Sequence, residues 1–175
     1  MKYITAILLL SLPLTTLANE VKGGFDYKFK EKIDVSNLEL IKVTKVEGDQ
    51  YKYTPEKPYG NLTNYSVYVT PKTQSVYKIE AKGHFQTKAD CKQELSSLEE
   101  ALSKKYGAKK PDFSAAISGT PIIRLGGNGK RIVGMCNLYA APYQLTLAYM
   151  DDSQTQVAKR ERASIINSER DVSGL

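Results

Sequence analysis

Two cysteines, Cys91 and Cys136, constrain the fold of this chain more than any other feature of its sequence. A single pair in an exported protein is typical of a disulfide. The bridge would close a loop of roughly 45 residues, and loop-closure entropy would then stabilise the domain by on the order of 4 kcal/mol. A reactive thiol is the alternative, because Cys91 stands near a predicted helix start, where the helix dipole lowers a thiol pKa. We favour the disulfide, since neither cysteine belongs to a Cys-x-x-Cys motif.

The amino terminus predicts the export that such a disulfide requires. A lysine is followed by an apolar run over residues 3–14 and by small residues that end at Ala18. This pattern is typical of a secretory signal peptide cut between Ala18 and Asn19, with a buried N-terminal strand as the alternative. The run is shorter than the roughly 20 residues that span a bilayer. We therefore expect a signal peptide over residues 1–18, and one exported domain over 19–175 that is periplasmic or secreted and does not span the membrane.

The spacing of apolar residues indicates an α+β domain. Period-two alternation and β-branched residues predict strands over residues 25–33, 38–46, 64–70, 75–81, 122–125, 131–136 and 143–150. Helical spacing predicts a helix over residues 90–106, capped by Asp90 and stopped by Gly107. A second helix is capped within residues 151–153 and runs to about residue 169. Runs of adjacent strands favour an antiparallel sheet of about six or seven strands, with both helices packed on one face.

Few residues suit catalysis or metal binding. The only histidine, His84, ends a predicted strand, and no Gly-x-Ser-x-Gly motif occurs. The adjacent pairs Glu99–Glu100 and Asp151–Asp152 do not converge on one ion, because neighbouring side chains point apart. The glycine-rich stretch 126–131 fails the Walker pattern and predicts a tight hairpin turn. We predict no catalytic residue, metal site or cofactor, although two carboxylates for glycoside hydrolysis can come from anywhere in a fold.

Tyrosine is the most unusual component of the composition, with 12 in the chain. Its rigid apolar ring and polar tip make tyrosine common at recognition surfaces. Tyr51, Tyr53 and Tyr59 fall in a stretch with two prolines and one glycine that predicts a surface loop. Lys109 and Lys110 follow the first predicted helix and form a basic pair. We select these five residues as candidates for partner binding; ordinary packing of the rings and solvation of the lysines are the alternatives.

The charge and the missing catalytic pattern together favour a binding protein. The formal net charge is +6, which outside the cytoplasm favours lipid head groups, acidic glycans or an acidic protein over nucleic acid, ordinary solubility charge being the alternative. Our lead hypothesis is a non-enzymatic periplasmic or secreted protein, of inhibitor or immunity type, that engages a protein or an anionic envelope component. One alternative is a small secreted hydrolase with carboxylates that the sequence does not identify. Another is an envelope assembly factor whose strand edges pair with client proteins.

Overall fold

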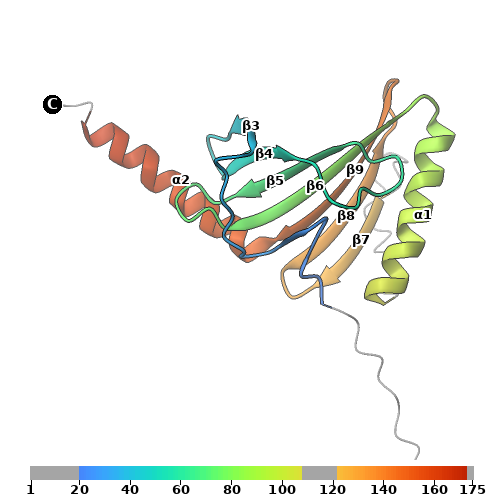
Figure 1. Cartoon of the computed structure of the whole chain (residues 1–175), viewed down its shortest axis with the longest axis horizontal. Helices are drawn as coiled ribbons and strands as arrows, with labels where there is room; N and C mark the ends of the chain where they lie inside the picture. Colours follow the sequence, from blue (N-terminus) through green and yellow to red (C-terminus); the bar gives the residue numbers. More distant parts are fainter. Residues whose placement is uncertain (1–19, 108–121, 173–175) are drawn as a thin grey trace, which may run out of the picture.

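The computed structural model of the chain describes residues 20–107 and 122–172. These residues form a seven-stranded antiparallel sheet in the order β3-β4-β5-β6-β9-β8-β7, a small two-stranded sheet of β1 and β2, and two helices (Figure 1). One disulfide joins a helix to the large sheet. The expected single α+β domain with an antiparallel sheet and one disulfide is therefore confirmed.

The elements follow the predicted order with two differences: a pair of short strands replaces the predicted strand over residues 25–33, and β4 is an additional strand of the large sheet. The small sheet pairs β1 (Gly23–Gly24) with β2 (Tyr27–Lys28). The large sheet contains β3 (Glu39–Val43), β4 (Asp49–Tyr53), β5 (Asn64–Val69), β6 (Val76–Phe85), β7 (Ile122–Gly127), β8 (Lys130–Asn137) and β9 (Tyr143–Asp151). The helices are α1 (Lys88–Tyr106) and α2 (Asp152–Val172).

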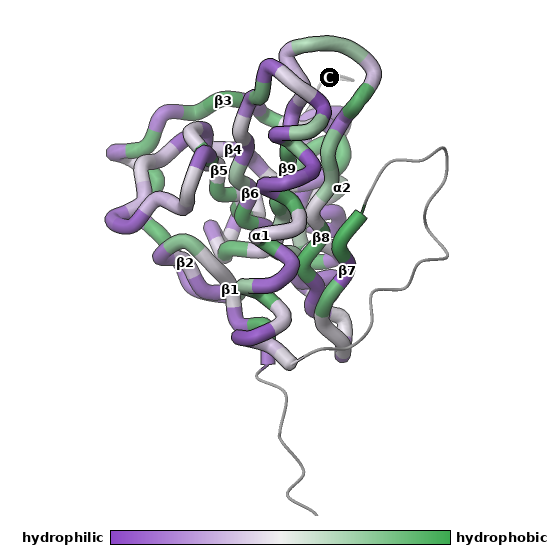
Figure 2. The backbone as a smooth tube through the Cα atoms, turned by 90° about the vertical axis from the view of Figure 1, so that its right-hand side faces the viewer, coloured by the Kyte–Doolittle hydropathy of each residue, from purple (hydrophilic) through white to green (hydrophobic). Residues whose placement is uncertain are grey.

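One face of the large sheet carries the hydrophobic core. Alternate residues of its central strands point to this face and are fully buried, among them Val67, Ile79, Ala81, Leu145 and Leu147. Helix α1 covers part of the face, and Figure 2 shows the hydrophobic strands β7 and β8 beside it. The helix buries Leu95, Leu98 and Leu102, each of which contributes roughly 1.5–3 kcal/mol relative to exposure. The segment 20–29 covers another part of the face with Val21 and Phe29.

Residues 25–33 do not form the predicted strand. Phe25 and Asp26 have positive φ angles of 48° and 77° and turn the chain between β1 and β2. Lys30 also has a positive φ, 68°, which interrupts any extended run. The apolar alternation still has a structural basis, because Phe29 is buried and Tyr27 packs against the core. The pattern marked the inward-facing side chains correctly, but it did not reveal the turns.

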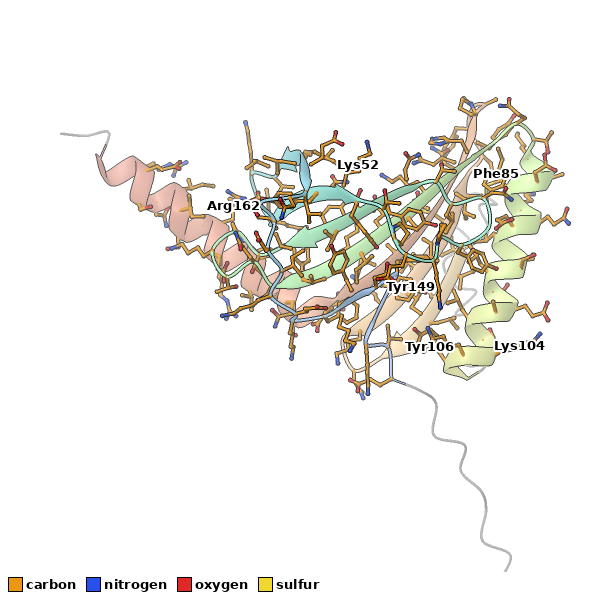
Figure 3. All side chains as sticks on the ribbon, in the orientation of Figure 1. Lys52, Phe85, Lys104, Tyr106, Tyr149 and Arg162 are labelled. Atoms are coloured by element: carbon orange, nitrogen blue, oxygen red, sulfur yellow. A yellow bond between two sulfur atoms is a disulfide. The ribbon has the colours of Figure 1, made fainter. Side chains whose placement is uncertain are left out.

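Helix α2 continues directly from β9 and leaves the sheet at one end (Figure 1). The carboxylate of Asp151 accepts a hydrogen bond from the Gln154 amide at 3.1 Å, so the cap lies where it was predicted. Arg162 anchors the helix to the end of the sheet (Figure 3): it donates to the Glu47 carbonyl at 3.0 Å and forms an ion pair with Asp49. The expectation of two helices on one face is wrong, since α1 covers a face and α2 covers an end. In the described part of the chain, neither helix is long and apolar enough to cross a bilayer.

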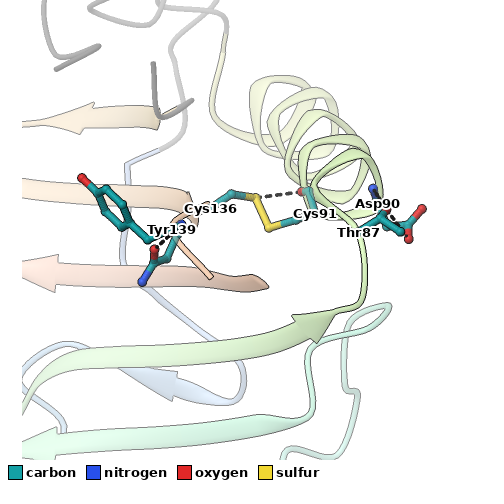
Figure 4. The surroundings of a disulfide bond; sticks show 6 residues. Thr87, Asp90, Cys91, Cys136 and Tyr139 are labelled. Carbon is teal, nitrogen blue, oxygen red and sulfur yellow. Dashed lines mark hydrogen bonds between the residues drawn. A yellow bond between two sulfur atoms is a disulfide. The ribbon is translucent and has the colours of Figure 1, made fainter. Parts of the chain in front are cut away.

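Helix α1 begins earlier than predicted, because Thr87 rather than Asp90 is its N-cap. The Thr87 oxygen accepts a hydrogen bond from the Asp90 amide at 3.1 Å, and its hydroxyl donates to the Asp90 carboxylate at 2.7 Å (Figure 4). Gly107, with a φ of 81°, ends the helix as expected. Cys91 in α1 and Cys136 in β8 form the predicted disulfide, with their Cα atoms 6.1 Å apart (Figure 4). The bridge fixes the start of α1 to the sheet.

Candidate functional site

Two of the candidate recognition tyrosines lie on a strand rather than in a loop. Tyr51 and Tyr53 belong to β4, where they pair with Val67 and Tyr65 of β5. The prediction of a loop beginning at residue 51 is wrong, because the prolines that suggested it follow the strand. Both rings are half-buried and face the core side of the sheet. Their role in binding a partner stays a prediction.

An aromatic cluster joins the segment 20–29 to the sheet. The Tyr53 ring packs edge-on against Tyr27 at 4.8 Å and Tyr65 at 6.1 Å. The Phe25 ring packs edge-on against Tyr65 at 5.1 Å and Tyr149 at 5.6 Å. The Tyr53 hydroxyl donates to the Phe25 carbonyl at 2.8 Å. Burial raises the pKa of the Tyr53 and Tyr149 hydroxyls above the ordinary tyrosine range, so both stay protonated. Each ring pair adds about 0.5–1.5 kcal/mol beyond area burial, which holds the segment in place.

A pocket of about 340 Å³ lies between this segment, helix α1 and the loop that follows β4. Buried leucines and one tyrosine form its deep walls: Leu98 and Leu102 from α1, and Leu147 and Tyr149 from β9. Figure 3 shows Tyr149 between the N-terminal segment and the sheet. The remaining lining comes from Gly24, Phe25, Lys57, Pro58, Tyr59, Ala101 and Lys105. Of the three selected binding residues that the structure describes, Tyr51, Tyr53 and Tyr59, only Tyr59 lines this pocket.

A groove of about 580 Å³ adjoins the pocket. It shares Gly24, Phe25 and Lys105 with the pocket and adds Lys22 and Lys28. Its two acids have partners already. Glu20 forms an ion pair with Lys130, which lowers the Glu20 pKa. The Asp26 carboxylate accepts a hydrogen bond from the backbone amide of Glu56 at 2.7 Å. Lysines outnumber carboxylates along both linings, so the mouth of the pocket favours an anion.

The glycine and phenylalanine at the pocket roof explain its shape. A Cβ atom at Gly24 would lie 2.8 Å from the Tyr149 ring, so only glycine lets the segment approach β9 this closely. Phe25 adopts a positive φ of 48°, which is rare for a bulky residue. Such a conformation persists where surrounding contacts fix it, often at ligand sites. Here the contacts are the two tyrosine rings beneath it.

A second, polar depression of about 440 Å³ holds His84, the histidine considered for catalysis. His84 is exposed near the end of β6, as expected. The nearby Glu94 carboxylate accepts a hydrogen bond from the side-chain amide of Asn61 at 3.1 Å, and the Asp90 carboxylate accepts one from the Thr87 hydroxyl. These contacts stabilise loop and helix rather than orient a base.

Four of the candidate residues selected from the sequence fall outside the described part of the chain. Ala18, Asn19, Lys109 and Lys110 lie outside the described residues. Within residues 20–107 and 122–172, no cluster of three or more histidine, cysteine or carboxylate side chains could hold a metal ion. Sequence reasoning missed Lys57 and Lys105 at the pocket mouth. Lys105 stands beside Lys104 in the last turn of α1, where the favourable interaction of cations with the helix dipole accounts for both lysines without a ligand.

Comparison of the chain with protein-family models, with curated proteins and with solved structures finds no match. The function therefore has to be argued from the geometry of the site.

Proposed function

We propose that this protein is an exported, non-enzymatic binding protein, and that its pocket holds an amphiphilic acid. The observation that carries the proposal is the division of the site into two parts. The deep walls are leucine, phenylalanine and tyrosine, and the mouth carries Lys57 and Lys105. An apolar chain inside and an anionic head group at the lysines would satisfy both parts.

The size and construction of the pocket support a small ligand. Ligand sites commonly occupy about 300–1,000 Å³ and are mostly apolar with a few polar groups that set orientation. The volume of about 340 Å³ falls at the lower end of that range and suits one acyl chain. Tyr59 at the rim is half-buried, so its ring can close over such a chain without leaving the fold.

Export is supported by two features that are independent of the pocket. The apolar amino-terminal run has the composition of a signal peptide. The Cys91–Cys136 disulfide is typical of an oxidising compartment. Acyl-bearing anions such as fatty acids and lysophospholipids fall within the anionic envelope components that the sequence analysis favours as partners.

Isothermal titration calorimetry of the purified protein tests the proposal, with laurate, a lysophosphatidylglycerol and dodecanol as probes. We expect saturable binding of an anionic probe and weaker binding of the neutral alcohol. Binding of laurate alone would identify a fatty-acid site, and preference for the lysophospholipid would identify a lipid head-group site.

Replacing Ala101 by Phe fills the pocket from an exposed helix position, so it should weaken binding by roughly tenfold or more without unfolding the chain.

Substitution of the mouth lysines separates the charge contribution from the apolar contribution. Lys57→Gln and Lys105→Gln should each weaken anion binding by up to roughly fivefold and leave dodecanol binding unchanged. Lys104→Gln is the matched control, because Lys104 is on the outward side of α1 and pairs with Glu100 (Figure 3). The proposal fails if no probe binds saturably, or if Ala101→Phe binds laurate as tightly as the wild type.

A further inference from the structure

Strand β3 forms one edge of the large sheet and exposes apolar side chains. Leu40, Ile41 and Val43 are 50%, 48% and 54% exposed, and Val46 just beyond the strand is 65% exposed. Figures 1 and 2 show β3 at the outer rim of the sheet. Among residues 20–107 and 122–172, no strand pairs with the side of β3 that faces away from β4. Such an edge presents unpaired N–H and C=O groups to any strand that approaches it.

A β-bulge at Ile41 gives this edge an unusual arrangement of charge. In a regular strand, residues three apart point to opposite faces. The register of β3 on β4 shifts between Leu40 and Lys42. Glu39 therefore lies opposite Lys52, and Lys42 lies opposite Gln50, which is two residues from Lys52. Because directly paired residues share a face, Glu39 and Lys42 both point to the same side of the sheet.

We propose that β3 pairs antiparallel with β3 of a second copy of this chain, so that two sheets join edge to edge in a homodimer. One register sets Glu39 opposite Lys42 of the second copy, and two-fold symmetry repeats the pair. The same register sets Leu40 opposite Ile41 of the second copy, so exposed apolar side chains of the two strands meet at the centre of the interface. In this register opposite charges face each other and apolar residues face apolar residues, and both kinds of pair stabilise cross-strand pairing.

The charge pattern selects a second copy over an unrelated strand. A lysine on an edge strand usually discourages pairing, because an approaching strand must bury its charge. Lys42 has an acidic counterpart in its own sequence, at the position that the two-fold axis requires. The strand spans five residues, so the interface is smaller than the roughly 1,600 Å² of a standard stable complex. We therefore expect a weak dimer that forms with increasing protein concentration.

Sedimentation velocity over roughly micromolar to millimolar concentration tests this dimer through its charge pairs. Glu39→Lys and Lys42→Glu each place like charges opposite each other twice per dimer, so each variant alone should dissociate at least roughly fivefold more readily. A one-to-one mixture of the two variants places a lysine opposite a glutamate at both positions. The mixture should therefore recover dimerisation to near the wild-type level.

Lys104→Glu on α1 makes the same change of charge as Lys42→Glu and should leave dimerisation unchanged. Melting curves check that both edge variants remain folded, as expected because the Glu39–Lys52 ion pair is exposed. The proposal is overturned if the wild type stays monomeric at every concentration. It is equally overturned if a dimer persists unchanged in both edge variants, or if their mixture does not recover it. None of these readouts depends on the ligand pocket.

Discussion

At the scale of single residues, Gly48 lies so close to the neighbouring strand β5 that a larger side chain does not fit. A Cβ atom there would lie 1.9 Å from the Val69 carbonyl oxygen and 2.7 Å from the Tyr77 ring. The Gly48 amide also donates to the Tyr77 hydroxyl at 3.3 Å. The oxygen belongs to the backbone of β5, so it cannot move without disturbing strand pairing. Gly48→Ala should therefore lower the free energy of unfolding by roughly 1–3 kcal/mol, measured by urea denaturation.

Gly127 provides the matched control, because an added Cβ would meet nothing within 4 Å and its φ is not positive. Gly127→Ala should change stability by no more than about 0.5 kcal/mol. Equal losses in the two variants would contradict the close-approach argument. From the sequence, Gly48 lies just beyond the predicted strand over residues 38–46 and has no further assigned role. Its real constraint depends on β5 lying alongside, which no local pattern of residues reveals.

At the scale of elements, β6 carries a buried carboxylate between two lysines of its own strand. The Glu80 oxygens lie 2.6 Å from the Lys78 nitrogen and 2.7 Å from the Lys82 nitrogen, and the Tyr68 hydroxyl donates to Glu80 at 3.2 Å. The pKa of Glu80 is lower than its ordinary value of 4.5. Burial is the largest single influence and acts to raise the pKa, but the combined effect of Lys78 and Lys82 is larger and lowers it. The group is thus kept ionised and suits a structural role better than that of a general acid.

The depressed pKa of Glu80 predicts how stability depends on pH. The ionised group stabilises the fold above the pKa of the unfolded chain, near 4.5, and this stabilisation disappears as pH falls through the lower folded pKa. Glu80→Gln should lower the free energy of unfolding by about 1–3 kcal/mol at pH 7 and flatten its decline in acid. Urea denaturation at several pH values measures both effects. Glu100→Gln is the control. Lys104 lowers the Glu100 pKa as well, but solvent screens this exposed pair, so the variant should stay close to the wild-type profile. An unaltered acid decline in Glu80→Gln would refute the assignment.

The elements that sequence patterns predicted well are those bounded by turn or capping residues close by in the sequence. The turn between β7 and β8 follows from Asn128-Gly129, whose φ angles are both positive, at 53° and 74°. Helix α1 follows from its apolar stripe and Gly107. Strand β4 was missed because Gly48-Asp49 and the later prolines indicated turns on both sides of it. Its five residues are strand because β3 and β5 flank them, and that pairing is not local.

At the scale of the whole molecule, the pocket could not be read from the sequence, because its walls come from distant parts of the chain. Gly24 and Phe25 form the roof, Tyr59 the rim, Leu98 one wall and Tyr149 the floor. Each residue has an ordinary local explanation as turn, loop or core. Only Tyr59 was selected, since a tyrosine in a loop with proline and glycine has less core to fill. Chain-wide folding brings the five together, so a search for motifs in one segment had no means of finding them.

The disulfide acts on the whole molecule, because it joins α1, one wall of the pocket, to β8 across a sequence separation of 45 residues. Replacing both Cys91 and Cys136 by Ala avoids an unpaired buried hydroxyl and should lower the free energy of unfolding by roughly 2–4 kcal/mol. Because the bridge acts mainly by restricting the unfolded chain, reduced wild type and the double variant should have nearly equal stability in urea denaturation with reductant. Alkylation of unreduced wild type should find no free thiol. Two free thiols in protein taken from its native compartment would contradict the bridge. Helix α1 would then be held on the sheet by side-chain packing without a covalent link, mainly through Leu95, Leu98, Leu102 and Tyr106.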